Sequence, residues 1–120
     1  LTECLQSIFC QEGQVDAQIF VVENGHQTKE IKLICDQYPQ VRYFFTSIKS
    51  RSHARNVLLD KIETPFVAYI DDDVILDQNW SKEGLTNFDS TLTVAAGGAI
   101  IKSGNKGFFL NYRLSVNTFG

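Results

Sequence analysis

The stretch Phe66–Val74 reads FVAYIDDDV and places a short apolar run directly before three consecutive aspartates. The apolar part, Phe66–Ile70, has the length and the aromatic and β-branched composition that are typical of a buried strand. Three adjacent carboxylates repel one another unless a cation compensates their charge. Because Mg2+ and Mn2+ bind oxygen ligands and complete their shells with water and substrate phosphates, the stretch predicts a strand that ends at a divalent-metal site.

The three aspartates are expected to face different sides of this strand end. If the backbone stays extended, Asp71 and Asp73 point to one side and Asp72 points to the other. Such spacing suits an edge that holds a metal ion and a ribose. The pattern leaves two alternatives open, because an acidic loop can simply be solvated and a single aspartate can cap the helix that follows.

The rest of the chain alternates between helical and strand-like patterns. Apolar residues at helical spacing predict helices near Leu1–Phe9, near Ile31–Cys35, from Arg51 or Ser52 to Leu59 and, more weakly, at Trp80–Phe88. Short β-rich runs predict strands at Gln18–Val22, Val41–Phe45 and Thr91–Lys102, with a loop from Ser103. This order predicts an α/β fold with three layers, α/β/α, around a mainly parallel sheet. Ligands of such sheets bind beyond the carboxyl ends of the strands.

Length and composition indicate one globular domain. With 120 residues, of which 43% are hydrophobic, the chain has enough apolar material for one core. A net charge of -3 excludes a general attraction to nucleic acid. No apolar run approaches the roughly 20 residues of a membrane span, so we expect a soluble chain. Cys4, Cys10 and Cys35 lack CxxC spacing and are expected to be reduced core thiols of a cytoplasmic protein.

Two further polar clusters lie at predicted ligand-binding positions. Residues 23–26 read ENGH after a predicted strand, where a carboxylate or amide can hydrogen-bond a base or ribose and Gly25 permits a sharp turn. Taken alone, an ordinary turn is the better interpretation of this run. The second cluster either faces a diphosphate or forms a solvated helix face. It consists of Lys49, Arg51, His53 and Arg55.

Four segments in order along the chain resemble a family 2 glycosyltransferase of the GT-A fold. They are LTECLQSI at 1–8 with Gln11, IFVVENG at 19–25, ARN at 54–56, and FVAYIDDDV at 66–74 with Trp80. The last segment resembles the DXD region of that family. Together the four segments cover most of the chain, so the resemblance is more specific than any one motif.

The resemblance implies a role for several residues in binding a nucleotide-sugar. Asn24 would lie near the nucleobase with Glu23 beside it, and Arg55 near the base or the diphosphate. Asp71, with Asp72 in the same nucleotide-sugar-binding set, would contact the ribose or a metal-bound water. Asp73, with Asp71, would hold Mn2+ or Mg2+ bridging the two phosphates.

By the same resemblance, the complete enzyme transfers a sugar from a nucleoside diphosphate donor of the UDP or dTDP type. The acceptor is a saccharide or a lipid-linked saccharide, the anomeric configuration is inverted, and the location is the cytoplasm or the inner face of its membrane. The family's first strand and its catalytic base, a carboxylate, are expected outside this chain. We therefore interpret residues 1–120 as a single partial domain that binds the donor, with an open sheet edge that favours self-association.

Two other interpretations compete with this one. The run YIDDDVIL at 69–76 also resembles the nucleophile motif of haloacid-dehalogenase-like phosphatases, in which the first aspartate attacks phosphate. That motif opens its domain, whereas about half of this chain precedes Asp71. The remaining interpretation is a non-catalytic fragment that binds a nucleotide or serves in assembly.

Overall fold

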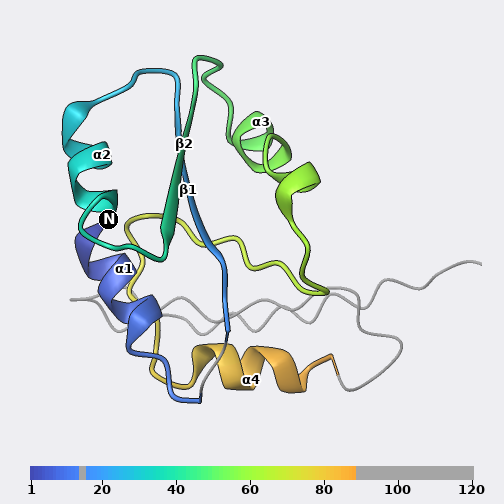
Figure 1. Ribbon diagram of the computed structural model, residues 1–120. Helices are drawn as coiled ribbons and strands as arrows, with labels where there is room; N and C mark the ends of the chain where they lie inside the picture. The colour runs from blue at the N-terminus through green and yellow to red at the C-terminus, as the bar shows by residue number, and fades with distance from the viewer. Residues whose placement is uncertain (14–15, 89–120) are drawn as a thin grey trace, which may run out of the picture. The chain divides into compact units, whose positions relative to one another are not determined.

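The computed structural model describes residues 1–13 and 16–88 (Figure 1). The chain divides into two compact units. Of the described residues, the first unit contains Leu1–Gln6 and Asp16–Ile75, and the second contains 7–13 and 76–88. Helix α1, Thr2–Phe9, contributes residues to both units and confirms the first predicted helix.

The first unit is built on a parallel pair of strands. Strand β1 runs from Ile19 to Asn24 and strand β2 from Val41 to Thr46. Their register places Ile19 opposite Val41 and Asn24 opposite Thr46. Both strands therefore end at the same edge, which is where ligands of parallel sheets bind. The parallel pairing confirms the expected sheet type.

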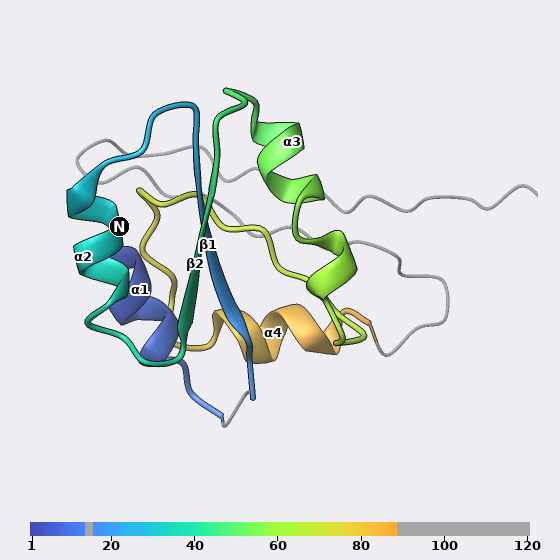
Figure 2. The same cartoon turned by 45° about the horizontal axis from the view of Figure 1, so that its top comes forward.

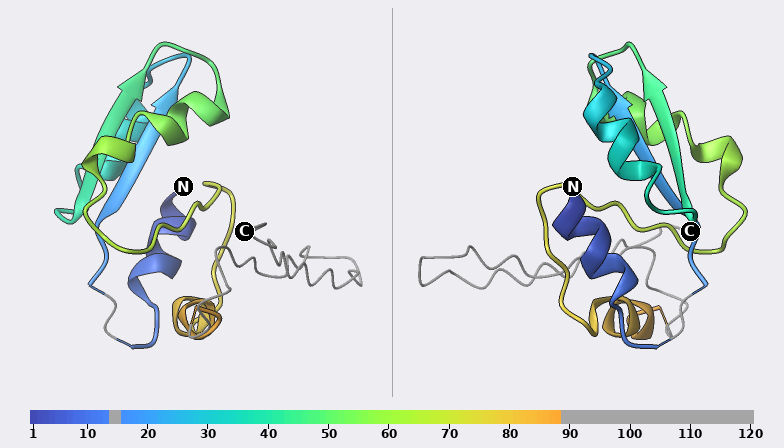
Figure 3. Two further views of the ribbon diagram at one scale, coloured as in Figure 1. Left: turned by 90° about the vertical axis from the view of Figure 1, so that its right-hand side faces the viewer. Right: turned by 60° about the vertical axis from the view of Figure 1, so that its left-hand side comes forward.

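Helices cover both faces of the sheet that β1 and β2 form in the described part of the chain. Helix α2, Lys29–Cys35, connects the strands and contacts β2, whereas helix α3, Arg51–Asn56, contacts β1. Figures 1 and 2 show the strands between the two helices, and Figure 3 shows the same order from two further directions. The expected α/β fold with three layers is thus confirmed.

Side-chain caps define where the two covering helices begin. Thr28 precedes α2 in an extended conformation, and its hydroxyl accepts a hydrogen bond from the backbone N–H of Ile31. Ser50 precedes α3 in the same way and accepts from the N–H of His53 at 3.2 Å. Because the first N–H groups of a helix lack partners within the helix, such caps fix its first residue.

The prediction of a strand at Phe66–Ile70 is wrong. These residues join neither β1 nor β2, which are the strands found in the described part of the chain. Phe66, Val67 and Tyr69 are 48%, 44% and 53% exposed. A suitable composition makes a strand only where a neighbour supplies ladder hydrogen bonds, and neither strand of the sheet does so here. The predicted strand Thr91–Lys102 and the loop from Ser103 lie outside the described residues.

Two smaller predictions also need correction. The helix expected to reach Leu59 ends at Asn56, and a short 3-10 helix follows at Leu59–Lys61. All three cysteines are free, but only Cys4 and Cys35 are buried, so Cys10 is not a core thiol. Its position beyond the last residue of α1 leaves it exposed.

The second unit contains helix α4, Trp80–Thr86, which confirms the weakest predicted helix. The side chain of Gln11 holds the segment that leads into it. The amide group donates to the carbonyl of Asp77 at 2.7 Å and accepts from the N–H of Ser81 at 2.8 Å. Gln11 therefore caps α4 from another part of the chain, while Asn79, the residue before the helix, makes no side-chain cap bond. Within the described residues, no helix has the length and apolar character needed to cross a membrane.

Candidate functional site

The turn after β1 and the loop after β2 are joined at the carboxyl edge of the sheet. The N–H of Gly25 donates to the carbonyl of Thr46 at 2.9 Å. Gly25 has φ 86°, and a Cβ at this position would lie 3.0 Å from Cβ of Lys49. The stem of Lys49 thus packs directly on Gly25, next to Asn24. A residue with a side chain would not fit without a shift of Lys49.

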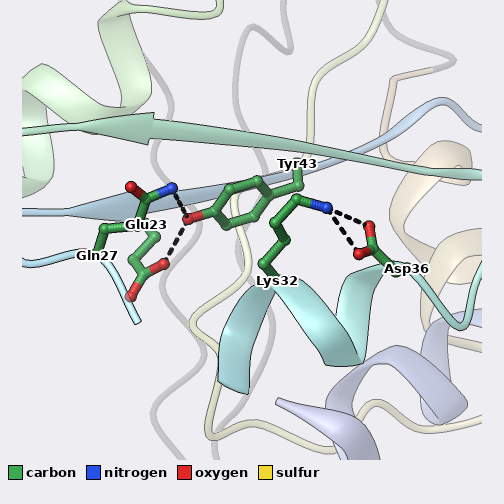
Figure 4. A network of polar contacts seen from close by, with 5 residues as sticks. All are labelled: Glu23, Gln27, Lys32, Asp36 and Tyr43. Atoms are coloured by element: carbon green, nitrogen blue, oxygen red, sulfur yellow. Dashed lines mark hydrogen bonds and ion pairs between the residues drawn. The ribbon is translucent and has the colours of Figure 1, made fainter. Parts of the chain in front are cut away.

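Glu23, which is buried, lies at the centre of a polar network beside this turn (Figure 4). Glu23 is only 9% exposed. One carboxylate oxygen, Oε1, accepts from the N–H and the hydroxyl of Thr28 at 2.8 and 2.9 Å. The other, Oε2, accepts from the hydroxyl of Tyr43 at 2.5 Å, and the same hydroxyl accepts from the amide of Gln27 at 3.3 Å.

These contacts decide the charge state of the network. Burial alone would raise the pKa of Glu23, but the hydrogen bonds from Tyr43 and Thr28 together outweigh it and hold the pKa below its ordinary value. For Tyr43, burial and then the Glu23 carboxylate both raise the pKa of the phenol. At neutral pH the pair is therefore an ionised acceptor and a neutral donor, which gives a strong hydrogen bond.

The three aspartates lie in a turn, not in an extended strand end. The N–H of Val74 donates to the carbonyl of Asp71 at 3.3 Å, which closes the turn. Side chains alternate between two sides only along an extended backbone. Because these residues form a turn, the structure gives no basis for the prediction that Asp71 and Asp73 point to one side and Asp72 to the other. All three side chains are exposed.

The backbone of this acidic turn is held by Cys4 of α1. The Cys4 thiol donates to the carbonyl of Asp71, with a distance of 3.6 Å between Sγ and O. Burial raises the pKa of the Cys4 thiol; the nearby N-terminus lowers it, and the carboxylates of Asp72 and Asp73 raise it. Because the net shift is upward, the thiol stays protonated at neutral pH and can serve as the donor.

Arg55, from the ARN segment at 54–56, lies beside the acidic turn. Its Nη2 lies 4.0 Å from Oδ1 of Asp71, and its guanidinium carbon lies 5.3 Å from the centre of the Tyr69 ring. The ring therefore supports the guanidinium from one side through a cation–π contact. The side chains of Arg55 and Asp71 are 49% and 66% exposed, so both charges remain accessible to a ligand.

The carboxylates of the acidic turn suit a divalent cation that takes its remaining ligands from water and a substrate. Within residues 1–13 and 16–88, no group of three or more His, Cys, Asp and Glu side chains is arranged to hold a metal ion by itself. Mg2+ is commonly held by one or two carboxylates, with water and phosphate oxygens completing its shell. Exposed carboxylates at Asp71 and Asp73 can supply that smaller set.

A comparison with protein families gives a match over almost the whole chain. The model of glycosyl transferase family 2 matches residues 1–119. The chain belongs to glycosyl transferase family 2. No curated protein and no solved structure matches it. The family match includes the residues before Asp71, which the phosphatase interpretation did not explain.

For this glycosyltransferase-family chain, the structure brings some of the predicted site residues together and leaves others apart. Arg55 meets Asp71, and Lys49 meets the turn of Asn24 and Gly25. In the described part of the chain, no hydrogen bond or ion pair links Glu23 or Asn24 to the three aspartates. The predicted set thus forms two groups within the first unit, one at the sheet edge and one at the acidic turn.

Sequence reasoning missed Tyr43 and Cys4 as contacts of the site residues. In the sheet, Tyr43 lies opposite Val21, and residues 21 and 23 of a strand share a face. Tyr43 and Glu23 are therefore diagonal neighbours, which interact when one side chain is long. Only the strand register could have revealed this pair. The Cys4 contact involves a backbone carbonyl, which leaves no signal in the sequence.

Proposed function

We propose that this family 2 chain forms the donor-binding part of a glycosyltransferase. The donor is a nucleoside diphosphate sugar of the UDP or dTDP type, and the acceptor is a saccharide or a lipid-linked saccharide, glycosylated with inversion. Family membership supports glycosyl transfer in general. The observation that carries the donor assignment is the contact between Arg55 and Asp71, because it joins two motifs that are 16 residues apart into one accessible pair of opposite charges.

Each predicted residue has a role in this proposal that suits its place. Asn24, at the carboxyl edge of β1, contacts the nucleobase, with Glu23 beside it. Arg55 turns its guanidinium from Asp71 to the negatively charged diphosphate. The planar guanidinium matches the geometry of phosphate oxygens well. Asp71, with Asp72 in the same nucleotide-sugar-binding set, contacts the ribose or a metal-bound water, and both are exposed. An accessible arginine beside accessible carboxylates supports this division of roles.

Asp71 and Asp73 are the residues that we propose to hold Mn2+ or Mg2+. When bound, the ion supplies positive charge that stabilises the diphosphate leaving group. Asp71 and Asp73, both exposed in the acidic turn, would hold the ion. Cys4, which bonds to the Asp71 carbonyl, limits the movement of the turn that carries them.

Calorimetric titration of UDP into the full chain, with and without Mn2+, tests this proposal. We expect saturable binding that depends on Mn2+ and is lost in Asp73→Ala. Asp60→Ala is the matched control, because Asp60 is an exposed aspartate in the 3-10 helix outside the acidic turn. Repeating the titration with dTDP distinguishes the two donor types. If neither UDP nor dTDP gave heat, donor binding would be contradicted and a non-catalytic assembly role would be favoured.

A further inference from the structure

The carboxylate of Glu23 ties together the two ends of the turn between β1 and α2. Glu23 is the next-to-last residue of β1, and Thr28 is the residue that caps α2. Because Oε1 of Glu23 accepts both the N–H and the hydroxyl of Thr28, one carboxylate oxygen closes the turn Asn24–Gln27. The Thr28 hydroxyl also accepts from the N–H of Ile31, so the start of α2 is fixed to the same point.

Tyr43 fixes the other oxygen of this carboxylate from the neighbouring strand. Its hydroxyl donates to Oε2 of Glu23 and accepts from the side-chain amide of Gln27, the last residue of the turn (Figure 4). Tyr43 therefore contacts the residue just before the turn, Glu23, and the last residue of the turn, Gln27. On the β2 side, the hydrogen bond from Gly25 to Thr46 holds the middle of the turn.

Most of the acceptor capacity of Glu23 is used inside the protein. A carboxylate has about four lone-pair positions, and three of those of Glu23 are taken by Thr28 and Tyr43. Glu23 is also only 9% exposed, which leaves little room for a ligand to approach its carboxylate. Asn24 differs, because it is half-buried and its side-chain amide makes no hydrogen bond with the described residues.

We propose that Tyr43, acting through Glu23, positions the turn Asn24–Gln27, and that Glu23 itself does not touch the nucleotide. Tyr43, Glu23 and Thr28 are positioning residues, and Asn24 is the residue of the turn that meets the ligand. The effect on the turn follows from the contacts above. Its consequence for donor binding rests on the proposed function.

Two measurements on the full chain test this inference. The first is the hydrogen-exchange rate of the Thr28 and Gly25 amides by NMR, and the second is the affinity for UDP with Mn2+. The variants are Tyr43→Phe, Glu23→Gln and the double variant, with Tyr38→Phe as the matched control for loss of a tyrosine hydroxyl. Asn24→Ala reports on the ligand contact without loss of the carboxylate network.

We expect Tyr43→Phe to speed exchange of the Thr28 amide by about tenfold and to weaken UDP binding by a similar factor, because a hydrogen bond to an ionised group is lost. Glu23→Gln should act in the same direction, and the double variant should be no worse than the more affected single variant. Tyr38→Phe should leave exchange at Thr28 unchanged. Asn24→Ala should weaken UDP binding while exchange at Thr28 stays near the wild-type rate.

Two results would overturn the inference. One is wild-type exchange at Thr28 in Tyr43→Phe. The other is loss of UDP binding in Glu23→Gln with exchange at Thr28 unaltered, because Glu23 would then act by direct contact. If the wild-type chain does not bind UDP, the proposed function fails, and the exchange rates alone decide whether Tyr43 positions the turn.

Discussion

The guanidinium of Arg55 lies 4.0 Å from the carboxylate of Asp71 and stacks on the ring of Tyr69. The contact connects the last turn of α3 to the residues that lead into the acidic turn. Ion pairs this exposed contribute at most about 1 kcal/mol to the free energy of unfolding, because water screens both charges. Separating Arg55 from Asp71 therefore costs little free energy, and a negatively charged ligand can compete for the guanidinium.

Replacing Arg55 by alanine should affect ligand binding more than stability. We expect the free energy of unfolding to fall by less than about 1 kcal/mol and UDP affinity to fall by about tenfold. Urea denaturation and calorimetry measure the two effects. Arg42→Ala is a matched control, because Arg42 also stacks on an aromatic ring, Phe20, at 5.9 Å. Equal losses of UDP affinity in both variants would contradict a specific role for Arg55.

The stability of the chain should depend on pH through Glu23. Its pKa in the folded state lies below the ordinary value of about 4.5, so the folded state favours the ionised form. The resulting stabilisation is present in full above about pH 4.5 and is lost as the pH falls through the lower, folded-state pKa. Urea denaturation at several pH values between about 7 and 3 measures this loss.

Glu23→Gln is the variant that isolates this effect. It cannot ionise, so its free energy of unfolding should be lower at neutral pH and should change less on acidification than that of the wild type. Asp60→Asn, at an exposed aspartate, is the matched control for the loss of a carboxylate. If Glu23→Gln and the wild type lost stability in parallel over the acidic range, Glu23 would not be the group responsible.

The parts of the fold that could be predicted from the sequence are those with a local cause. Helix α1 and strands β1 and β2 appear within about two residues of the expected bounds, because apolar spacing and composition act over a few neighbours. Phe66–Ile70 has a strand-like composition, yet it forms no strand in the described part, since ladder hydrogen bonds depend on a neighbour that composition does not identify.

The candidate site divides in the same way. The sequence alone showed that Asn24 and Asp71 are polar residues at the ends of apolar runs, where a ligand site is expected. The order of the four motifs identified the family. The contact of Arg55 with Asp71 and that of Tyr43 with Glu23 depend on tertiary packing and on register. Neither is encoded by spacing along the chain, so only the structure could reveal them.

Two glycines with the same backbone angle allow the clash at the sheet edge to be measured separately. Gly25 and Gly13 both have φ 86°, but a Cβ at Gly13 meets no described residue within 4 Å, whereas a Cβ at Gly25 would lie 3.0 Å from Lys49. Gly13→Ala should cost about 1 kcal/mol for the left-handed conformation alone. Gly25→Ala should cost more, and Gly25→Ala with Lys49→Gly should recover the difference. Equal costs in the two single variants would show that Lys49 does not restrict the turn.

In the second unit, stability of α4 should depend on Gln11 more than on the residue that precedes the helix. Gln11→Ala removes the acceptor for the Ser81 N–H and the donor to the Asp77 carbonyl, and loss of a helix cap typically costs about 1 kcal/mol. Asn79→Ala removes a side chain that makes no cap bond, so it should change the free energy of unfolding by a few tenths of a kcal/mol at most. Urea denaturation and exchange of the Ser81 amide compare the two variants. Faster exchange at Ser81 in Asn79→Ala than in Gln11→Ala would show that the cap lies within the local sequence and not in the distant glutamine.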